Sequence, residues 1–163
     1  MGYTTDFDGY FDLSPALSPE QVAYINKLGL TRRMKRDEAK ASLMPDPIRE
    51  AVGLPLGKDA EYFTGGGGFA GQDKDDSIID YNRPGGSQPG LWLQWEVNPA
   101  GDTLAWDGQE KFYDYVKWLE YLIEHFFRPW GIEVNGEVEW RGEEWEDTGV
   151  IKAGGHVVEV TYG

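Results

Sequence analysis

The sequence has no cysteine, only two histidines and a shortage of positive charge. Without cysteine, the chain forms no disulfide, no thiolate nucleophile, no cysteine zinc site and no iron–sulfur cluster. Two histidines are too few for a histidine-rich zinc site, and they argue against a catalytic triad. Lysine and arginine total 15 against 29 aspartate and glutamate residues, so the formal net charge is −14. We therefore expect no metal, no cofactor and no enzymatic activity.

Long apolar runs are also missing. The longest, such as Tyr121–Ile123, span a few residues, so the sequence predicts no membrane helix and no contact with a membrane. Residues 1–8 have neither a basic flank nor an apolar block, so no signal peptide is predicted. We expect a cytoplasmic protein.

Aromatic residues, in contrast, are abundant. They make up 14% of the 163 residues, and seven of them are tryptophans. Such a chain can build a buried core, and its length is typical of one domain. We predict a single domain over residues 1–163, and we keep a homo-oligomer as an open alternative because spare aromatic side chains need cover.

The chain opens with a strand and a short helix. Apolar residues alternate with polar ones from Phe7 to Leu13, which indicates a strand with one buried face. Ser18 and Pro19 are typical of a helix start, and Gly29 is typical of its end.

Residues 31–90 show no long period. They contain five prolines and the glycine run 65–68. We predict a loop-rich insertion at about 31–90, with a short helix near Asp46–Val52, because a stretch of this length without clear elements is unusual in a compact domain.

Regular patterns return at residue 90. Alternation over Leu91–Val97 predicts a strand, and Thr103–Trp106 follows a turn as the second arm of a hairpin. Gln109–Arg128 carries an apolar stripe at helical spacing and predicts the longest helix. Ile132–Trp140 predicts either a tight hairpin or one bent strand at its Asn-Gly step, and residues 149–162 predict a final hairpin.

These elements predict an α+β fold. Their order is β-α-insertion-ββ-α-βββ, with a mostly antiparallel sheet, one long helix and one short helix. A ferredoxin-like split β-α-β core is the alternative topology.

Four cations crowd into five residues of this acidic chain, in the run Arg32–Arg36. Clustered positive charge is repulsive unless an anion or an acidic surface compensates it, and arginines bind phosphate through paired hydrogen bonds. The glycine loop of the insertion adds backbone amides that can approach a phosphate, although no P-loop lysine follows it. The ligand site predicted from these features comprises Arg32, Arg33, Lys35, Arg36, Gly66, Gly67, Phe69, Gln72, Asn82, Arg83 and Trp92. The alternative is that the cations pair with the protein's own carboxylates.

A second candidate surface is acidic. Residues 133–147 contain seven carboxylates against one arginine, with two tryptophans interleaved. Such a ribbon can imitate a nucleic-acid backbone and occupy a basic groove of another protein, whereas plain solubility is the competing interpretation. The predicted helix adds aromatic side chains outside its core stripe, which either meet a partner or pack beneath the insertion. The predicted partner-binding residues are Trp118, Tyr121, His125, Glu143, Glu144 and Trp145.

Several segments together resemble a widespread family of small hypothetical proteins of bacteriophages and bacteria. The segments are 6–11, 31–37, 88–95, 106–113 and 135–140, with the motifs TRRMKRD, QPGLW, WDGQEKFY and NGEVEW. The resemblance carries over no catalytic residue. It implies a phage accessory protein that acts in the host cytoplasm, and such proteins often counter host defence.

Two functions follow as hypotheses. The first is a non-enzymatic anti-defence protein that binds and sequesters a small anionic, nucleotide-like ligand or immune signal, held by the basic run and the glycine loop. The second is an acidic nucleic-acid mimic that inhibits a basic host defence protein. An enzyme acting on a nucleotide ranks last, because no nucleophile–base pair is evident.

Overall fold

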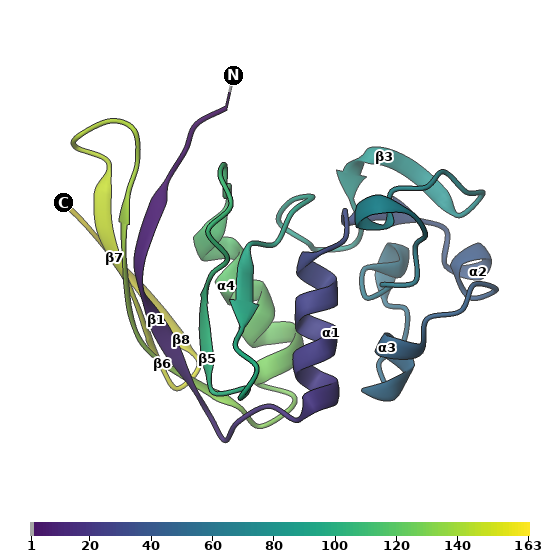
Figure 1. The fold of residues 1–163 in the computed structure, drawn as a ribbon, viewed down its shortest axis with the longest axis horizontal. Helices are drawn as coiled ribbons and strands as arrows, with labels where there is room; N and C mark the ends of the chain where they lie inside the picture. Colours follow the sequence, from purple (N-terminus) through teal and green to yellow (C-terminus); the bar gives the residue numbers. More distant parts are fainter. Residues whose placement is uncertain (1) are drawn as a thin grey trace. The chain divides into compact units, whose positions relative to one another are not determined.

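Six strands form one antiparallel sheet in the computed structural model, which describes residues 2–163 (Figure 1). This architecture confirms the predicted α+β class. The strands are β1 (Asp6–Ser14), β4 (Trp95–Val97), β5 (Thr103–Trp106), β6 (Glu133–Arg141), β7 (Thr148–Gly154) and β8 (Val157–Tyr162). They belong to a compact unit that runs up to Pro19 and resumes at Gln94, while residues 20–93 form a second compact unit. The expectation of one domain with an insertion stays a prediction.

The strand order in the sheet is β4-β5-β1-β6-β7-β8. The second unit, which opens with a helix, lies between β1 and β4 in the chain, and another helix lies between β5 and β6. The first four positions therefore have the order and the antiparallel pairing of a ferredoxin-like split β-α-β sheet, which was the alternative topology. The final hairpin, β7–β8, extends this sheet as predicted.

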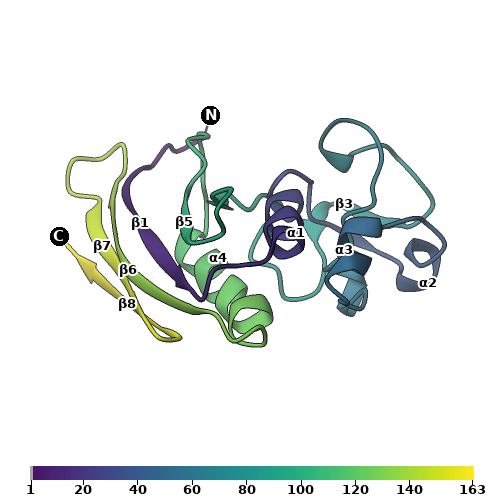
Figure 2. The same ribbon diagram turned by 60° about the horizontal axis from the view of Figure 1, so that its bottom comes forward.

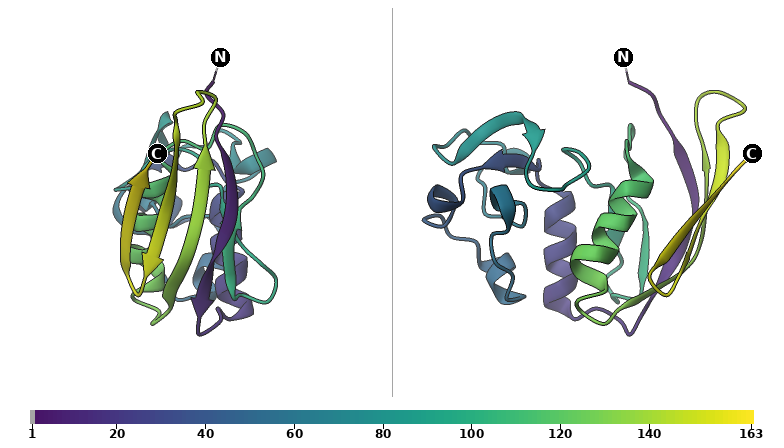
Figure 3. Two further views of the ribbon diagram at one scale, coloured as in Figure 1. Left: turned by 90° about the vertical axis from the view of Figure 1, so that its left-hand side faces the viewer. Right: turned by 180° about the vertical axis from the view of Figure 1, so that it is seen from behind.

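One face of the sheet is covered by α4 (Tyr115–Leu122), as Figure 3 shows. Most side chains on that face are apolar and buried, since alternate strand residues point to it and meet the helix. Val138 and Ile151 are Cα partners on neighbouring strands and are both fully buried. The opposite face carries no helix of this unit (Figure 3, left), so its side chains remain exposed.

The long helix begins later than predicted. Residues 109–114 are not helical, because Lys111 and Asp114 adopt left-handed backbone angles with φ of 63° and 56°. Helix α4 is followed by a π-helical turn, Ile123–Phe127, so the regular α-helical part is short.

Two strand boundaries also differ from the expectations. Residues 91–94 lie outside the strand, and only Trp95–Val97 pair as β4. Residues 133–141 form a single strand through Gly136, so the alternative of one strand is right and the tight hairpin is not formed. At Gly136 the φ of +140° favours glycine, and an added Cβ would lie 2.9 Å from the carbonyl oxygen of Tyr10.

The second unit consists of short elements. They are α1 (Pro19–Gly29), β2 (Met34–Arg36), α2 (Glu38–Ala41), α3 (Pro47–Ala51), the two 3₁₀ turns Lys58–Ala60 and Phe69–Gly71, and β3 (Ile78–Pro84). Helix α1 and helix α3 agree with the predictions. The two-stranded sheet β2–β3 was not predicted, because β2 has three residues and its partner lies far along the chain.

Candidate functional site

The basic run lies largely inside the second unit. Arg33 is 3% exposed and donates hydrogen bonds to four oxygens. Two acceptors are the carbonyl oxygens of Glu61 and Phe63, both at 2.8 Å, and the others are side-chain oxygens of Gln88 (2.8 Å) and Thr31 (2.7 Å). Arg33 therefore ties three segments of this unit together.

Arg36 is also internal, at 4% exposure. Its guanidinium contacts a carboxylate oxygen of Asp75 at 3.0 Å and the Ser77 hydroxyl at 2.8 Å, and it stacks on Phe63 at 4.9 Å from the ring centre. Burial alone raises the pKa of Asp75, but hydrogen bonds from Ser77 and Arg36 outweigh burial and lower that pKa below its usual value. The pair matches the alternative in which the cations meet the protein's own carboxylates.

Arg32 keeps an accessible, unneutralised guanidinium. It donates to the carbonyl oxygen of Tyr81 at 3.0 Å and to the side chain of Asn82 at 3.1 Å. It also lies over the rings of Tyr81 and Trp92, at 4.3 and 5.8 Å from the ring centres. Among residues 2–163 it forms no ion pair.

Two further predicted ligand residues lie near the same small sheet. Lys35 on β2 is half-buried and is the Cα partner of Asp80 on β3. The exposed Arg83 forms an ion pair with Asp80 at 3.5 Å. The structure thus brings the predicted cations to β2, β3 and the two residues just before β2, but turns two of the cations, Arg33 and Arg36, inward.

The glycine loop is closed on itself. The amide of Asp73 donates to the carbonyl oxygen of Gly67 at 3.0 Å, and a Cβ on Gly66 would lie 2.7 Å from the carbonyl oxygen of Gly71. The Tyr81 hydroxyl donates to the side chain of Gln72 at 2.9 Å. These close approaches explain the glycines without a ligand, and Phe69 is left 90% exposed on the loop.

The predicted aromatic stripe on the long helix is not a surface. Trp118 and Tyr121 are buried, and His125 is half-buried with its ring stacked on Tyr121 at 4.0 Å. The prediction that Trp118 and Tyr121 face a partner was wrong, whereas for His125 it stays a prediction. The reason is that both the stripe and its neighbouring face are packed, so helical spacing alone did not identify the exposed side.

The loop between β6 and β7 carries the other predicted partner residues, and they are exposed. Trp145 is 88% exposed; the exposed Glu143 and Glu144 precede it, and the exposed Glu146 follows it. The loop is held in place by Asp147, which accepts hydrogen bonds from the Tyr3 hydroxyl at 2.7 Å and from the Trp140 indole at 3.0 Å. Further bonds join the amide of Thr4 to Glu143 and the amide of Glu144 to the Tyr3 hydroxyl. The indole of Trp145 is thus exposed to solvent between carboxylates, on a loop that hydrogen bonds hold in place.

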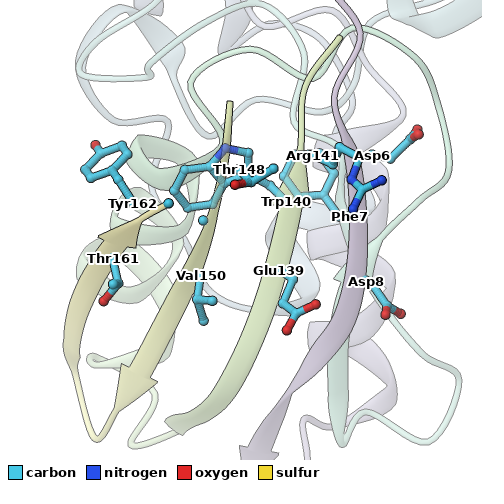
Figure 4. A pocket seen from close by; sticks show the side chains of 12 residues that line it. Asp6, Phe7, Asp8, Glu139, Trp140, Arg141, Thr148, Val150, Thr161 and Tyr162 are labelled. Atoms are coloured by element: carbon cyan, nitrogen blue, oxygen red, sulfur yellow. The ribbon is translucent and has the colours of Figure 1, made fainter. Parts of the chain in front are cut away.

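The uncovered face of the sheet is acidic. We call the part of it on β1, β6, β7 and β8 the acidic face, and the exposed carboxylates of this part are Asp6, Asp8, Asp12, Glu133, Glu137, Glu139 and Glu159. Two cations, Arg141 and Lys152, share this face, which leaves an excess of five negative charges. Asp8 and Glu139 are Cα partners on neighbouring strands, as Figure 4 shows. Sequence reasoning selected the carboxylates of residues 133–147 but missed those of β1.

A hollow of about 530 Å³ lies where β1, β6, β7 and β8 come together (Figure 4). Its rim includes carboxylates of the acidic face, Arg141 and the ring of Tyr162. Gly149 lies beneath Trp140, and a Cβ there would lie 2.1 Å from the indole. The absence of a side chain at this position lets the indole lie flat across β7.

Within residues 2–163, no group of three histidine, aspartate or glutamate side chains is placed to hold a metal ion. Over the same residues, no helix has the length and apolar character needed to cross a bilayer. The chain matches no known family profile, no curated protein and no solved structure. The resemblance to phage proteins stays an expectation.

Proposed function

We propose that this protein is a non-enzymatic binder of a basic partner protein, and that it occupies a surface on which the partner would otherwise hold a nucleic acid. The binding surface is the acidic face together with the β6–β7 loop. The observation that carries the proposal is Trp145, a tryptophan left 88% exposed on an anchored loop between carboxylates.

Tryptophan is enriched among the residues that dominate protein–protein binding energy. A rigid loop loses little conformational entropy on binding, because its own hydrogen bonds already hold it. The neighbouring Glu143 and Glu144 are exposed and would meet lysine or arginine side chains around the indole. This combination fits a basic protein surface with an apolar pocket.

The acidic face supports the same conclusion through its charge pattern. Asp8 and Glu139 are directly opposite on adjacent strands, and within residues 2–163 neither is in an ion pair. Like charges in this arrangement destabilise a sheet. A cationic partner would relieve that repulsion, so the charge pattern of the acidic face favours binding to a basic surface.

The resemblance to phage proteins suggests the biological setting. In that setting the partner would be a basic host defence protein that binds nucleic acid, and the bound acidic protein would act as its inhibitor in the host cytoplasm.

The experiment captures partners from a bacterial extract on the immobilised chain and then adds duplex DNA. We expect a basic protein that DNA displaces and that elutes as salt rises. Trp145→Ala should weaken its binding by about 2 kcal/mol, roughly 30-fold. The double variant Glu144→Lys/Glu146→Lys should abolish capture.

The matched control is Glu20→Lys/Glu50→Lys, which makes the same change in net charge at exposed positions of the second unit. If the control loses binding as much as the loop variant does, bulk charge rather than this surface explains capture. Failure of DNA to displace the partner would contradict the mimicry.

Ligand sequestration is a second candidate, and Arg32 is the observation that favours it. Its guanidinium is stacked on Tyr81 and Trp92 and lacks an ion pair in the described chain, so it could hold a phosphate beside an aromatic surface. Mass spectrometry of small molecules released from heated protein tests it directly. Calorimetry with nucleotides should then show binding that Arg32→Ala removes and Trp145→Ala leaves unchanged.

A further inference from the structure

Strand β8 is the outermost strand of the six-stranded sheet (Figure 2). In the part of the chain that the structure describes, no strand pairs with its outer side. Edge strands present unpaired N–H and C=O groups, and proteins usually protect them with proline, lysine, a bulge or a short length. β8 has six residues, no proline, and Glu159 as its one charge, whereas the opposite edge, β4, has three residues.

One row of β8 side chains continues the apolar face of the sheet beyond the part that the helix covers. Val158 and Val160 are Cα partners of the buried Ala153 and Ile151, so they point to the same side of the sheet. They are only half-buried, and Tyr162 in the same row is 80% exposed. An apolar row at an open edge can accept the side chains of one more strand.

The space beside this row is rimmed with negative charge. A hollow of about 270 Å³ is lined by Glu120, Ile123, Glu124, His156 and Val158. Glu120 forms no ion pair within residues 2–163, and Glu124 meets only the exposed Arg128, at 3.5 Å. These carboxylates add to the negative field that attracts a cationic segment toward this edge of the sheet.

The other row of β8 belongs to the acidic face. Glu159 is the Cα partner of Lys152, and Thr161 is the Cα partner of Val150. A strand added beside β8 would point half of its side chains toward this face. Lysine or arginine at those positions would meet Glu159 and the carboxylates beyond it.

We propose that β8 binds an extended basic segment of the partner as an additional strand, in which lysine or arginine alternates with apolar residues. Backbone hydrogen bonds to an edge give affinity, and alternate side chains give specificity. A second copy of this chain fits the edge less well, because each copy carries a net charge of −14. This inference rests on the proposed function and names the form in which the partner binds.

The test uses two end-capped peptides of identical composition. In one, lysine and valine alternate, and in the other, the lysines and valines form separate blocks. We expect the alternating peptide to bind the full-length chain at least about fivefold more tightly, because only it places all its lysines on one face of a strand. Hydrogen exchange of residues 157–162 should slow when it binds.

The charge-reversal variant Glu159→Lys should weaken binding of the alternating peptide about fivefold or more, since one attraction is replaced by one repulsion. The control is Glu96→Lys on β4, at the opposite edge of the same sheet, which should leave binding within about twofold.

Equal binding of both peptides would overturn strand addition but leave the proposed acidic binder intact. Absence of peptide binding, while a captured basic protein still depends on Trp145, would do the same. Sedimentation that shows a dimer, together with slowed hydrogen exchange of residues 157–162 in that dimer, would assign the edge to a second copy and overturn the inference.

Discussion

Replacing Arg33 with methionine should destabilise the second unit severely. The substitution keeps an unbranched side chain in the same buried space but removes every donor. The carbonyl oxygens of Glu61 and Phe63 and the side-chain oxygen of Gln88 would then lose the partner that the guanidinium supplies.

The magnitude follows from those acceptors. A buried polar group left without its partner costs about 1–3 kcal/mol, and removing one member of a buried charged network costs about 3–5 kcal/mol. We expect Arg33→Met to lower the free energy of unfolding by about 3–5 kcal/mol. That is a large part of the 5–15 kcal/mol that is typical of a folded domain.

The assay is hydrogen exchange read by mass spectrometry along a urea series, because it reports residues 20–93 separately from the rest of the chain. The control is Arg83→Met, which changes an 80% exposed arginine and should stay within about 0.5 kcal/mol. A loss below about 1 kcal/mol for Arg33→Met would refute the structural role of this arginine. Its guanidinium would then be available for the ligand site that the sequence suggested.

Three further predictions test other parts of the structure. Gly149→Ala should destabilise the sheet by about 1–3 kcal/mol in urea denaturation, because the new Cβ would collide with the buried Trp140. Tyr3→Phe should speed amide exchange in the β6–β7 loop, because it removes the hydrogen bond to Asp147. In the unchanged protein this bond raises the pKa of Tyr3, so its stabilisation should be present below about pH 10 and lost as pH rises further. The lowered pKa of Asp75 should give a stabilisation that is present above about pH 4 and lost as pH falls, and Asp75→Asn should flatten this acid limb of the stability curve.

Local signals in the sequence predicted the elements that local interactions determine. The alternation of Phe7–Leu13, the helix start at Pro19 and the hairpin of residues 148–162 each appear where neighbouring residues favour them. The start of α4 was missed because left-handed backbone angles at Lys111 and Asp114 interrupt a helical pattern that extends through them. No side-chain periodicity reports such an interruption.

The inward position of the arginines depends on contacts between distant segments. Two of the four acceptors of Arg33 are carbonyl oxygens that lie 28 and 30 residues away, and every residue type carries that group. One local signal did exist for Arg36: it lies two residues from Met34 on β2, so alternation places it on the same buried face. A run of cations interrupted by one apolar residue therefore favours a half-buried strand over a solvated patch.

The burial of these cations also shapes the surface. Arg33 and Arg36 are enclosed, and Arg36 is matched by Asp75, so neither offers its guanidinium to a molecule at the surface. Exposed carboxylates are then opposed by fewer exposed cations than the composition suggests, and seven of them gather on the acidic face. A negative field attracts a basic partner toward the protein during approach. The same field repels an anion that approaches Arg32, until the anion and the guanidinium lie within one Debye length, ~8 Å. The same arrangement that stabilises the second unit from within therefore favours protein binding on the sheet over capture of a small anion.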